Sequence, residues 1–145
     1  MTGGKASGAL PGIKLELIEL GRVDEPRGSL CVAEVGKHLG FEIRRVYWVF
    51  DVPEGGERAN HAHREQHEVL VAARGSFTVH CDDGSVRSRH TLDSPGIGLL
   101  IPAMNFHHLD DFSPGALCLV LASGPYDDAE YVHQYEEFRE LLSRR

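Results

Sequence analysis

Short runs of alternating or continuous apolar residues, rather than helical stripes, fill most of this chain. Residues 13–20 (IKLELIEL) alternate apolar and polar side chains, which is the period-2 pattern of a strand with one buried face. Residues 44–52 are β-branched and aromatic and end at the turn-forming run 53–56, so they also predict a strand. Similar runs occupy residues 24–35, 67–75, 76–84, 85–92, 97–102 and 116–123. Eight or nine short strands separated by close turns indicate an all-β sandwich or barrel.

The last segment of the chain has a different period. Four apolar residues between positions 127 and 145 recur at i, i+4, i+7 and i+11, namely Tyr131, Tyr135, Phe138 and Leu142. This spacing predicts a C-terminal amphipathic helix that packs on the sheet, with Asp127 or Asp128 as its N-cap.

The composition is that of one globular domain. Of the 145 residues, 41% are hydrophobic and 26% are charged, and a chain this short cannot supply two independent cores. We therefore expect a single domain over residues 13–145, preceded by a flexible tail over residues 1–12, which are rich in Gly, Ser and Ala. No apolar run approaches the roughly 20 residues of a membrane span. The N-terminus also lacks the apolar segment of a signal peptide, so we expect a cytoplasmic protein without membrane contact.

Charge and cysteine content narrow the classes of partner. A net charge of -7 and a pI near 5.7 argue against nucleic acid. An anionic substrate therefore needs a local group of arginines to offset the negative field. The three cysteines, Cys31, Cys81 and Cys118, are far apart and odd in number, so they predict no disulfide framework.

Histidine is abundant, with nine residues, and three of the histidines form a pattern. His61 and His63 share one face of a strand, because alternate strand residues point the same way, and Glu68 follows after a possible bend. Together with His107, these side chains suit one divalent ion such as Zn, Fe, Mn, Ni or Cu. Without a metal the same groups can act as general acid and base, because histidine titrates near neutral pH. Four isolated histidines are interpreted as structural or solvated: His38, His80, His90 and His133.

The spacing of these residues resembles the two metal-binding motifs of the cupin superfamily. The first motif is matched at every position, with five, one, four and six residues separating Gly55, His61, His63, Glu68 and Gly75. The second motif is matched in part by Gly96, Pro102 and His107, with Met104 in place of the usual Gly and Asp111 in place of the usual Asn. The resemblance implies a cupin jelly roll, also called a double-stranded β-helix.

A second resemblance covers nearly the whole chain, from about residue 13 to the C-terminus. Matching stretches in common order include Arg-Val-Tyr-Trp-Val-Phe-Asp (45–51), His-Ala-His (61–63), Arg-Gly-Ser-Phe (74–77), Gly-Leu-Leu-Ile-Pro (98–102) and Leu-Val-Leu-Ala-Ser (119–123). The chain is similar to the nucleotide-sugar 3,4-ketoisomerases of the WxcM-like family, small cupins that act on dTDP-4-keto-6-deoxy-D-glucose. This resemblance implies metal-free isomerisation of a 4-keto sugar to a 3-keto sugar through an enediol, in deoxysugar or aminosugar biosynthesis.

The family resemblance also implies roles for single residues. Its His-Ala-His pair falls on His61 and His63, the expected catalytic base and acid, and Tyr47 is the candidate hydroxyl that shuttles protons or donates to the sugar oxygens. The expected substrate-binding residues are Arg27, Arg45, Arg58, Glu68 and His107. The arginines are candidates for the diphosphate, because guanidinium forks suit phosphate oxygens, with surface ion pairs as the alternative interpretation.

Two other functions stay open at this point. One is a metal-dependent cupin enzyme with the ligands His61, His63, Glu68 and His107, since Glu68 stands where the ketoisomerases are expected to carry Gln. The other is a cupin that only binds a sugar or nucleotide. Ala59 is a further departure, because the family is expected to carry Gly there, and the change matters if the backbone has a positive φ.

A homodimer is also expected. The strand after the tail could pair with a partner chain, because unpaired sheet edges are usually covered. The resemblance to other small cupins implies the same assembly.

Overall fold

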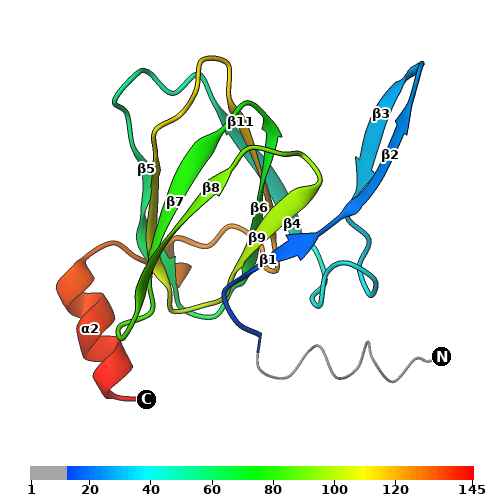
Figure 1. Ribbon diagram of the computed structural model, residues 1–145. Helices are drawn as coiled ribbons and strands as arrows, with labels where there is room; N and C mark the ends of the chain where they lie inside the picture. The colour runs from blue at the N-terminus through cyan, green and yellow to red at the C-terminus, as the bar shows by residue number, and fades with distance from the viewer. Residues whose placement is uncertain (1–12) are drawn as a thin grey trace.

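The computed structural model describes residues 13–145 and contains two antiparallel β-sheets that face each other (Figure 1). The first sheet consists, from edge to edge, of β1 (Glu16–Glu19), β9 (Ile97–Ile101), β6 (Glu68–Arg74), β11 (Leu117–Ala122) and β4 (Arg45–Phe50). The second consists of β12 (Tyr131–Val132), β5 (Arg58–His63), β10 (Phe106–Asp110), β7 (Phe77–Asp82) and β8 (Arg87–Leu92). The predicted all-β cupin jelly roll is confirmed. The tail predicted over residues 1–12 lies outside the described residues.

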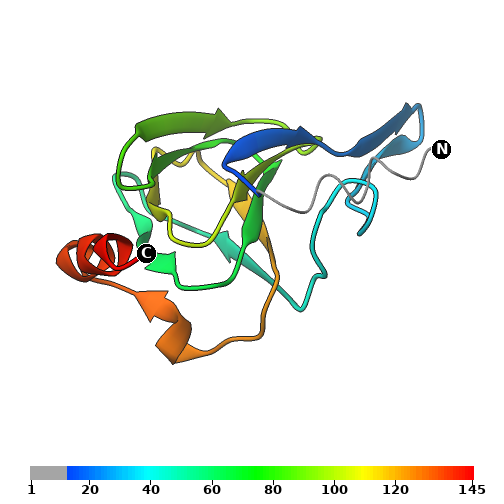
Figure 2. The same cartoon turned by 90° about the horizontal axis from the view of Figure 1, so that it is seen from below.

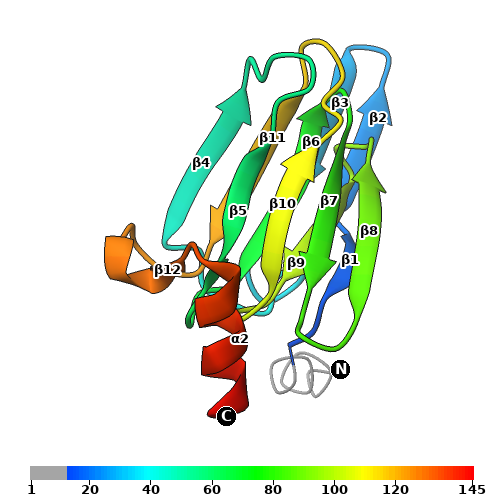
Figure 3. The ribbon, with the colours of Figure 1, turned by 90° about the vertical axis from the view of Figure 1, so that its left-hand side faces the viewer.

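The hydrophobic core lies between the two sheets, because alternate residues of each strand point inward. In β7, Phe77 and Val79 are fully buried, and they belong to the same cluster as Leu99 of β9 and Val120 of β11. Figure 3 shows β5, β10, β7 and β8 side by side in front of the first sheet. Burying each such side chain contributes roughly 1.5–3 kcal/mol, so these apolar rows hold the sheets together.

A hairpin of β2 (Gly21–Glu25) and β3 (Gly28–Val32) projects away from the two sheets (Figures 1 and 2). Its apolar side chains are exposed, with Val23 at 47%, Leu30 at 54% and Val32 at 41%. An isolated two-stranded hairpin is at best marginally stable in water, so these side chains need a partner surface.

The C-terminal helix is confirmed, but its predicted start at residue 127 is wrong. The helix α2 spans Tyr135–Ser143, and the Asp127 side chain instead caps the short 3-10 helix η1 (Asp128–Glu130). Between the two lies β12, in which Tyr131 pairs with His63 of β5. Pairing with the open edge of β5 satisfies backbone groups that a longer helix would leave without partners. The strands β10 and β12 were not predicted.

The shortened helix still packs as expected. Phe138 of α2 is fully buried against Ala62, Met104 and Val132. Figure 3 shows α2 at the lower end of the second sheet. Over residues 13–145, no helix is long and apolar enough to cross a membrane.

Left-handed backbone conformations occur at two glycines of the first cupin motif and at two positions where Gly was expected but another residue stands. Gly55 and Gly75 have φ values of 80° and 70°, and a Cβ on Gly75 would lie 2.5 Å from the Ser113 hydroxyl. Ala59 and Met104, which stand where Gly is usual, have φ values of 73° and 61°. For residues with a Cβ, this conformation costs roughly 1–2 kcal/mol, so both departures strain the backbone.

Replacing Ala59 by Gly should therefore stabilise the protein. The relief of backbone strain exceeds the entropy that the added glycine gives the unfolded chain, for a net gain of about 0.5–1 kcal/mol in the free energy of unfolding. Urea unfolding of wild type and Ala59→Gly measures the difference. Ala73→Gly, at an exposed position in β6 without a positive φ, is the matched control and should destabilise. An equal loss in both variants would contradict the strain.

Candidate active site

Seven of the eight predicted site residues meet at one end of the space between the sheets. A pocket of about 360 Å³ is lined by six of them: Arg45, Tyr47, Arg58, His61, Glu68 and His107. The seventh, His63, is 3% exposed and lies behind the pocket wall, with its ring centroid 4.7 Å from that of Tyr131. Strand alternation explains the grouping of Arg45 and Tyr47, because both lie on the inner face of β4.

The carboxylate of Glu68 organises the polar groups of this pocket. Glu68 is 1% exposed, and its Oε2 accepts a hydrogen bond of 2.8 Å from the Tyr47 hydroxyl. Nε2 of His63 lies 3.2 Å from the same oxygen, close enough for an ion pair although not aligned as a hydrogen bond, and Nη2 of Arg45 lies 3.7 Å away. Burial alone raises the pKa of Glu68, but His63, the His107 charge and the Tyr47 hydroxyl outweigh it and lower the pKa to about 2. Glu68 is therefore an anion at neutral pH.

The Glu68 anion also fixes the state of Tyr47. Burial, followed by the adjacent carboxylate charge, raises the pKa of the Tyr47 hydroxyl well above its usual value. The hydroxyl therefore keeps its proton at neutral pH and remains a hydrogen-bond donor.

His61 is a neutral imidazole in the centre of the pocket. Its ring centroid lies 4.9 Å from that of His63 and 5.0 Å from that of His107, which faces it across the β10–β5 pair. Burial, and then the neighbouring His107 and His63, lower the pKa of His61 to about 3. Its buried Nε2 has no hydrogen-bond partner among the described residues. A free imidazole nitrogen that can accept a proton therefore lies in the pocket.

Arg45 and Arg58 are placed to bind an anion at the pocket. Nε and Nη1 of Arg45 are buried without hydrogen-bond partners among residues 13–145, and its guanidinium lies 5.2 Å from the centre of the Tyr47 ring. Because unsatisfied buried donors cost roughly 1–3 kcal/mol each, they indicate where a ligand supplies acceptors. Arg58 lines the same pocket from an exposed position at the start of β5.

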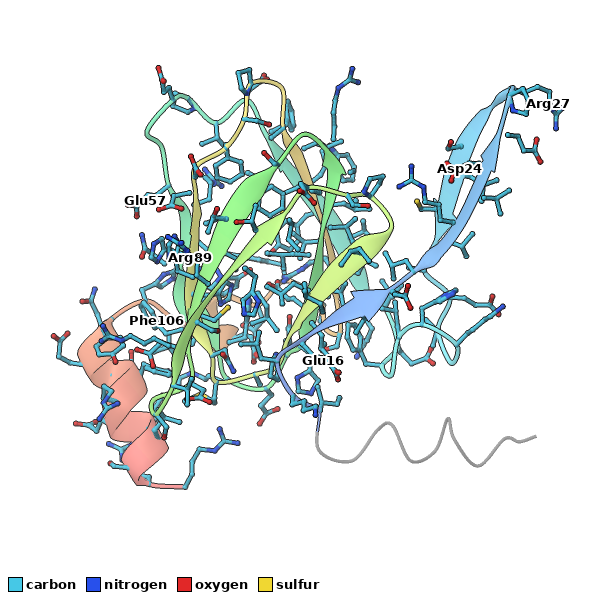
Figure 4. All side chains as sticks on the ribbon, viewed as in Figure 1. Glu16, Asp24, Arg27, Glu57, Arg89 and Phe106 are labelled. Atoms are coloured by element: carbon cyan, nitrogen blue, oxygen red, sulfur yellow. The ribbon has the colours of Figure 1, made fainter. Side chains whose placement is uncertain are left out.

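Arg27 does not join the other predicted residues within one chain. It lies at the tip of the β2–β3 hairpin, where its side chain is 89% exposed and pairs with Glu25 at 3.0 Å (Figure 4). Its predicted contact with substrate therefore stays a prediction.

Ten lining residues were not predicted as site residues, and four of them carry aromatic or charged side chains: Tyr126, Asp128, Tyr131 and His133. Tyr131 was expected on the helix, yet in β12 its ring lies 4.9 Å from that of His61. His133 was interpreted as structural or solvated; it is exposed, and its ring stacks on that of Tyr131 with the centroids 5.7 Å apart. The chain-long resemblance extends to the C-terminus and so includes these four residues, and that is the signal that could have found them.

The three buried histidines also fit a divalent ion. Ligand atoms of His61, His63 and His107 lie within 4.8 Å of one another. Nδ1 of His107 donates to the Asn105 carbonyl oxygen at 3.0 Å, which leaves its Nε2 unprotonated in the neutral ring. Glu68 is the least suited of the four predicted ligands, because its Oε2 already serves Tyr47, His63 and Arg45.

Comparison with known families tests the chain-long resemblance to the ketoisomerases. Residues 13–143 match the family model described as "FdtA: WxcM-like, C-terminal". The chain belongs to the WxcM-like family. The chain-long resemblance found in the sequence is thereby confirmed.

The relatives of this WxcM-like chain include sugar-nucleotide ketoisomerases. It is 37% identical to the TDP-4-oxo-6-deoxy-α-D-glucose-3,4-oxoisomerase of Aneurinibacillus thermoaerophilus over 129 residues. This alignment covers 89% of this chain and 93% of the relative. The TDP-quinovose 3,4-ketoisomerase of Campylobacter jejuni is 37% identical in sequence, and its structure superposes with a TM-score of 0.84. The superposition covers 88% of this chain and 98% of the relative. A variant 3,4-ketoisomerase of Thermoanaerobacterium thermosaccharolyticum in complex with TDP-4-keto-6-deoxyglucose is 27% identical, with a TM-score of 0.87 and coverage of 90% and 95%. The prediction of an enzyme of the 3,4-ketoisomerase class is confirmed.

The free energy of unfolding should decrease as the pH falls from 7 to 4. His61 has a folded pKa of about 3, below the usual 6.5, so between these values the unfolded state binds one more proton. One such group lowers stability by up to about 1.4 kcal/mol per pH unit. Below about pH 4.5 the lowered pKa of Glu68 acts in the same direction, because the unfolded carboxyl protonates first.

Urea unfolding at several pH values, for wild type and His61→Asn, measures this dependence. The variant should show a shallower slope between pH 6.5 and pH 4, because the titrating ring is gone. His38→Gln, in the loop between β3 and β4, is the matched control. Equal slopes for wild type and His61→Asn would mean that His61 is not held neutral by the fold.

Proposed function

We propose that this protein interconverts the 4-keto and 3-keto forms of TDP-4-keto-6-deoxyglucose, a step of deoxysugar or aminosugar biosynthesis. The activities of its relatives and the sugar nucleotide bound to one of them support this substrate. The observation that carries the proposal is the juxtaposition in one pocket of a neutral base, His61, and a protonated hydroxyl, Tyr47. The unpaired donors of Arg45 supply a binding element for the diphosphate.

The reaction is a proton transfer at two adjacent carbons. The 4-ketone acidifies the proton on C3, and Nε2 of His61 removes it. The electrons of the C3–H bond form a C3–C4 double bond, and O4 takes up a proton to give the enediol. Return of a proton to C4 and loss of the proton from O3 leave the ketone at C3, so no atom is gained or lost. General acid–base catalysis of this kind contributes typically 10²–10⁴-fold.

The groups around Glu68 handle the protons on oxygen. The Tyr47 hydroxyl donates to the developing enediolate oxygen, where a fixed donor is worth more than water because it needs no reorientation. His63, whose Nε2 lies 3.2 Å from the Glu68 carboxylate, is the acid of the pair that the family resemblance implies. His107 packs against His61 and, with Glu68, completes the polar wall that the sugar contacts.

A metal-dependent cupin enzyme is the second candidate, and the converging nitrogens of His61, His63 and His107 favour it. A divalent ion held by these residues would act as a Lewis acid on a carbonyl oxygen. The two candidates differ in whether a chelator abolishes turnover.

Proton NMR in deuterated water tests the isomerase directly. Chelator-treated protein with TDP-4-keto-6-deoxyglucose should remove the C3 proton signal and form a 3-keto product. His61→Asn should lower the exchange rate by about 10²–10⁴-fold while circular dichroism shows the fold retained. His38→Gln, outside the pocket, is the control and should keep the wild-type rate.

Other results of this experiment would favour the alternative functions. Undiminished exchange in His61→Asn would remove that residue as the base. Activity that chelation abolishes and a divalent ion restores would favour the metal-dependent enzyme. Binding of the sugar nucleotide without any exchange in wild type would indicate a cupin that only binds it.

We also propose that two copies associate through the β2–β3 hairpin. The hairpin is exposed, and β4 forms the edge of the first sheet with three large exposed side chains on its outer face, Val46, Trp48 and Phe50. A second copy covers both surfaces at once, because each copy offers one hairpin and one β4, as twofold symmetry requires. Because Arg27 lies at the tip of the hairpin, this association would place Arg27 of one copy against the surface of the other.

Trp48→Glu should shift the protein from dimer to monomer in sedimentation analysis, because it places a charge in the apolar contact. Val86→Glu, in the β7–β8 turn and 63% exposed, is the matched control and should stay dimeric. A wild-type protein that sediments as a monomer, or a dimeric Trp48→Glu, would rule this interface out.

A further inference from the structure

A second group of metal-ligating side chains lies outside the pocket, on β7 and β10. His80 and His108 face each other in the register of these strands, and their rings stack with centroids 4.4 Å apart and planes 8° apart. Nε2 of His80 lies 2.8 Å from Oδ1 of Asp110, and Nε2 of His108 lies 3.8 Å from Oδ2. Both imidazoles therefore turn the same nitrogen toward one carboxylate.

This group is separate from the catalytic pocket because of strand alternation. On β10, His107 points inward and is 2% exposed, whereas the side chains of His108 and Asp110 are each 32% exposed on the opposite face. The His80 side chain is 31% exposed on the same outer face of β7. An ion can therefore reach these three side chains from solvent without entering the space between the sheets.

We propose that His80, His108 and Asp110 bind one divalent transition-metal ion, of the zinc, nickel or copper class. Two imidazoles and a carboxylate are a ligand set that such ions prefer, and water fills the open position. The three ligand atoms lie within 4.8 Å of one another. Tetrahedral zinc with Zn–N distances near 2.1 Å separates its ligand atoms by about 3.4 Å and lies in the plane of each imidazole ring. To complete the site, the two half-exposed rings therefore tilt out of their parallel stack so that both nitrogens point at the ion.

The surroundings favour a cation. His80 and Asp110 also line an adjoining hollow. Its other charged lining residues are three carboxylates, Glu54, Glu57 and Asp111, and one cation, Arg89. Figure 4 shows Glu57 and Arg89 on this side of the molecule, away from the hairpin. With a net charge of -7 on the chain, the local excess of carboxylates attracts a divalent ion.

Equilibrium dialysis against zinc, with metal analysis of the protein, tests the site. His80→Gln and Asp110→Asn should each bind one zinc equivalent fewer than wild type. His61→Asn should keep this equivalent, so the outcome does not depend on whether the pocket also binds zinc. His38→Gln is the matched surface control and should bind as wild type does.

Imidazole nitrogen NMR identifies the ligands independently. On zinc addition, the Nε2 resonances of His80 and His108 should shift in wild type and stay unshifted in Asp110→Asn. The two variants remove different ligands, so misfolding of one leaves the other to decide. Equal zinc content in wild type and a folded His80→Gln, or shifts confined to His61, His63 and His107, would overturn the proposal.

Discussion

The buried carboxylate of Glu68 sets the polar architecture of the pocket. Moving a carboxylate out of water costs several kcal/mol unless charges and hydrogen bonds replace the solvent. The first residue of β6 meets this requirement because Tyr47, His63 and Arg45 all approach the same oxygen. Each partner is fixed in return: Tyr47 stays protonated, His63 is packed behind the wall, and Arg45 is held inward with donors left over for a ligand.

The jelly roll delivers these partners through strand register rather than through sequence neighbourhood. His61 and His107 come together because β5 and β10 pair, and Tyr47 reaches Glu68 from β4 although β11 lies between β4 and β6 in the sheet. Residues with a left-handed backbone conformation lie at or near the ends of these strands and set the direction of the chain there. Ala59 lies two residues before His61 and adopts φ 73°, so strain is stored next to the proposed base.

The parts of this arrangement that local spacing determines could be predicted from the sequence. Period-2 runs identified most of the strands, and the His61, His63 and Glu68 spacing identified the centre of the site. Tyr131 could not be placed, because its spacing to Tyr135 and Phe138 fits a helix and only pairing with β5 overrides that preference. His80 looked isolated for the same reason, since Asp110 lies 30 residues away and arrives through the β7–β10 pair. Arg27 lies away from the pocket because it belongs to the projecting β2–β3 hairpin rather than to either large sheet, and local spacing does not predict that separation.

The two histidine groups of this protein show how burial decides what imidazole does. Inside the sheets, burial lowers the pKa values of His61 and His107, and the nearby Glu68 carboxylate is committed to Tyr47, His63 and Arg45. Neutral rings beside a protonated hydroxyl suit proton transfer. On the outer face, His80 and His108 share a carboxylate in contact with water, and that ligand set suits a cation. Because adjacent residues of β10 point to opposite faces, this strand contributes a histidine to each group. A ligand can therefore occupy the inner pocket or the outer site without displacing a ligand from the other.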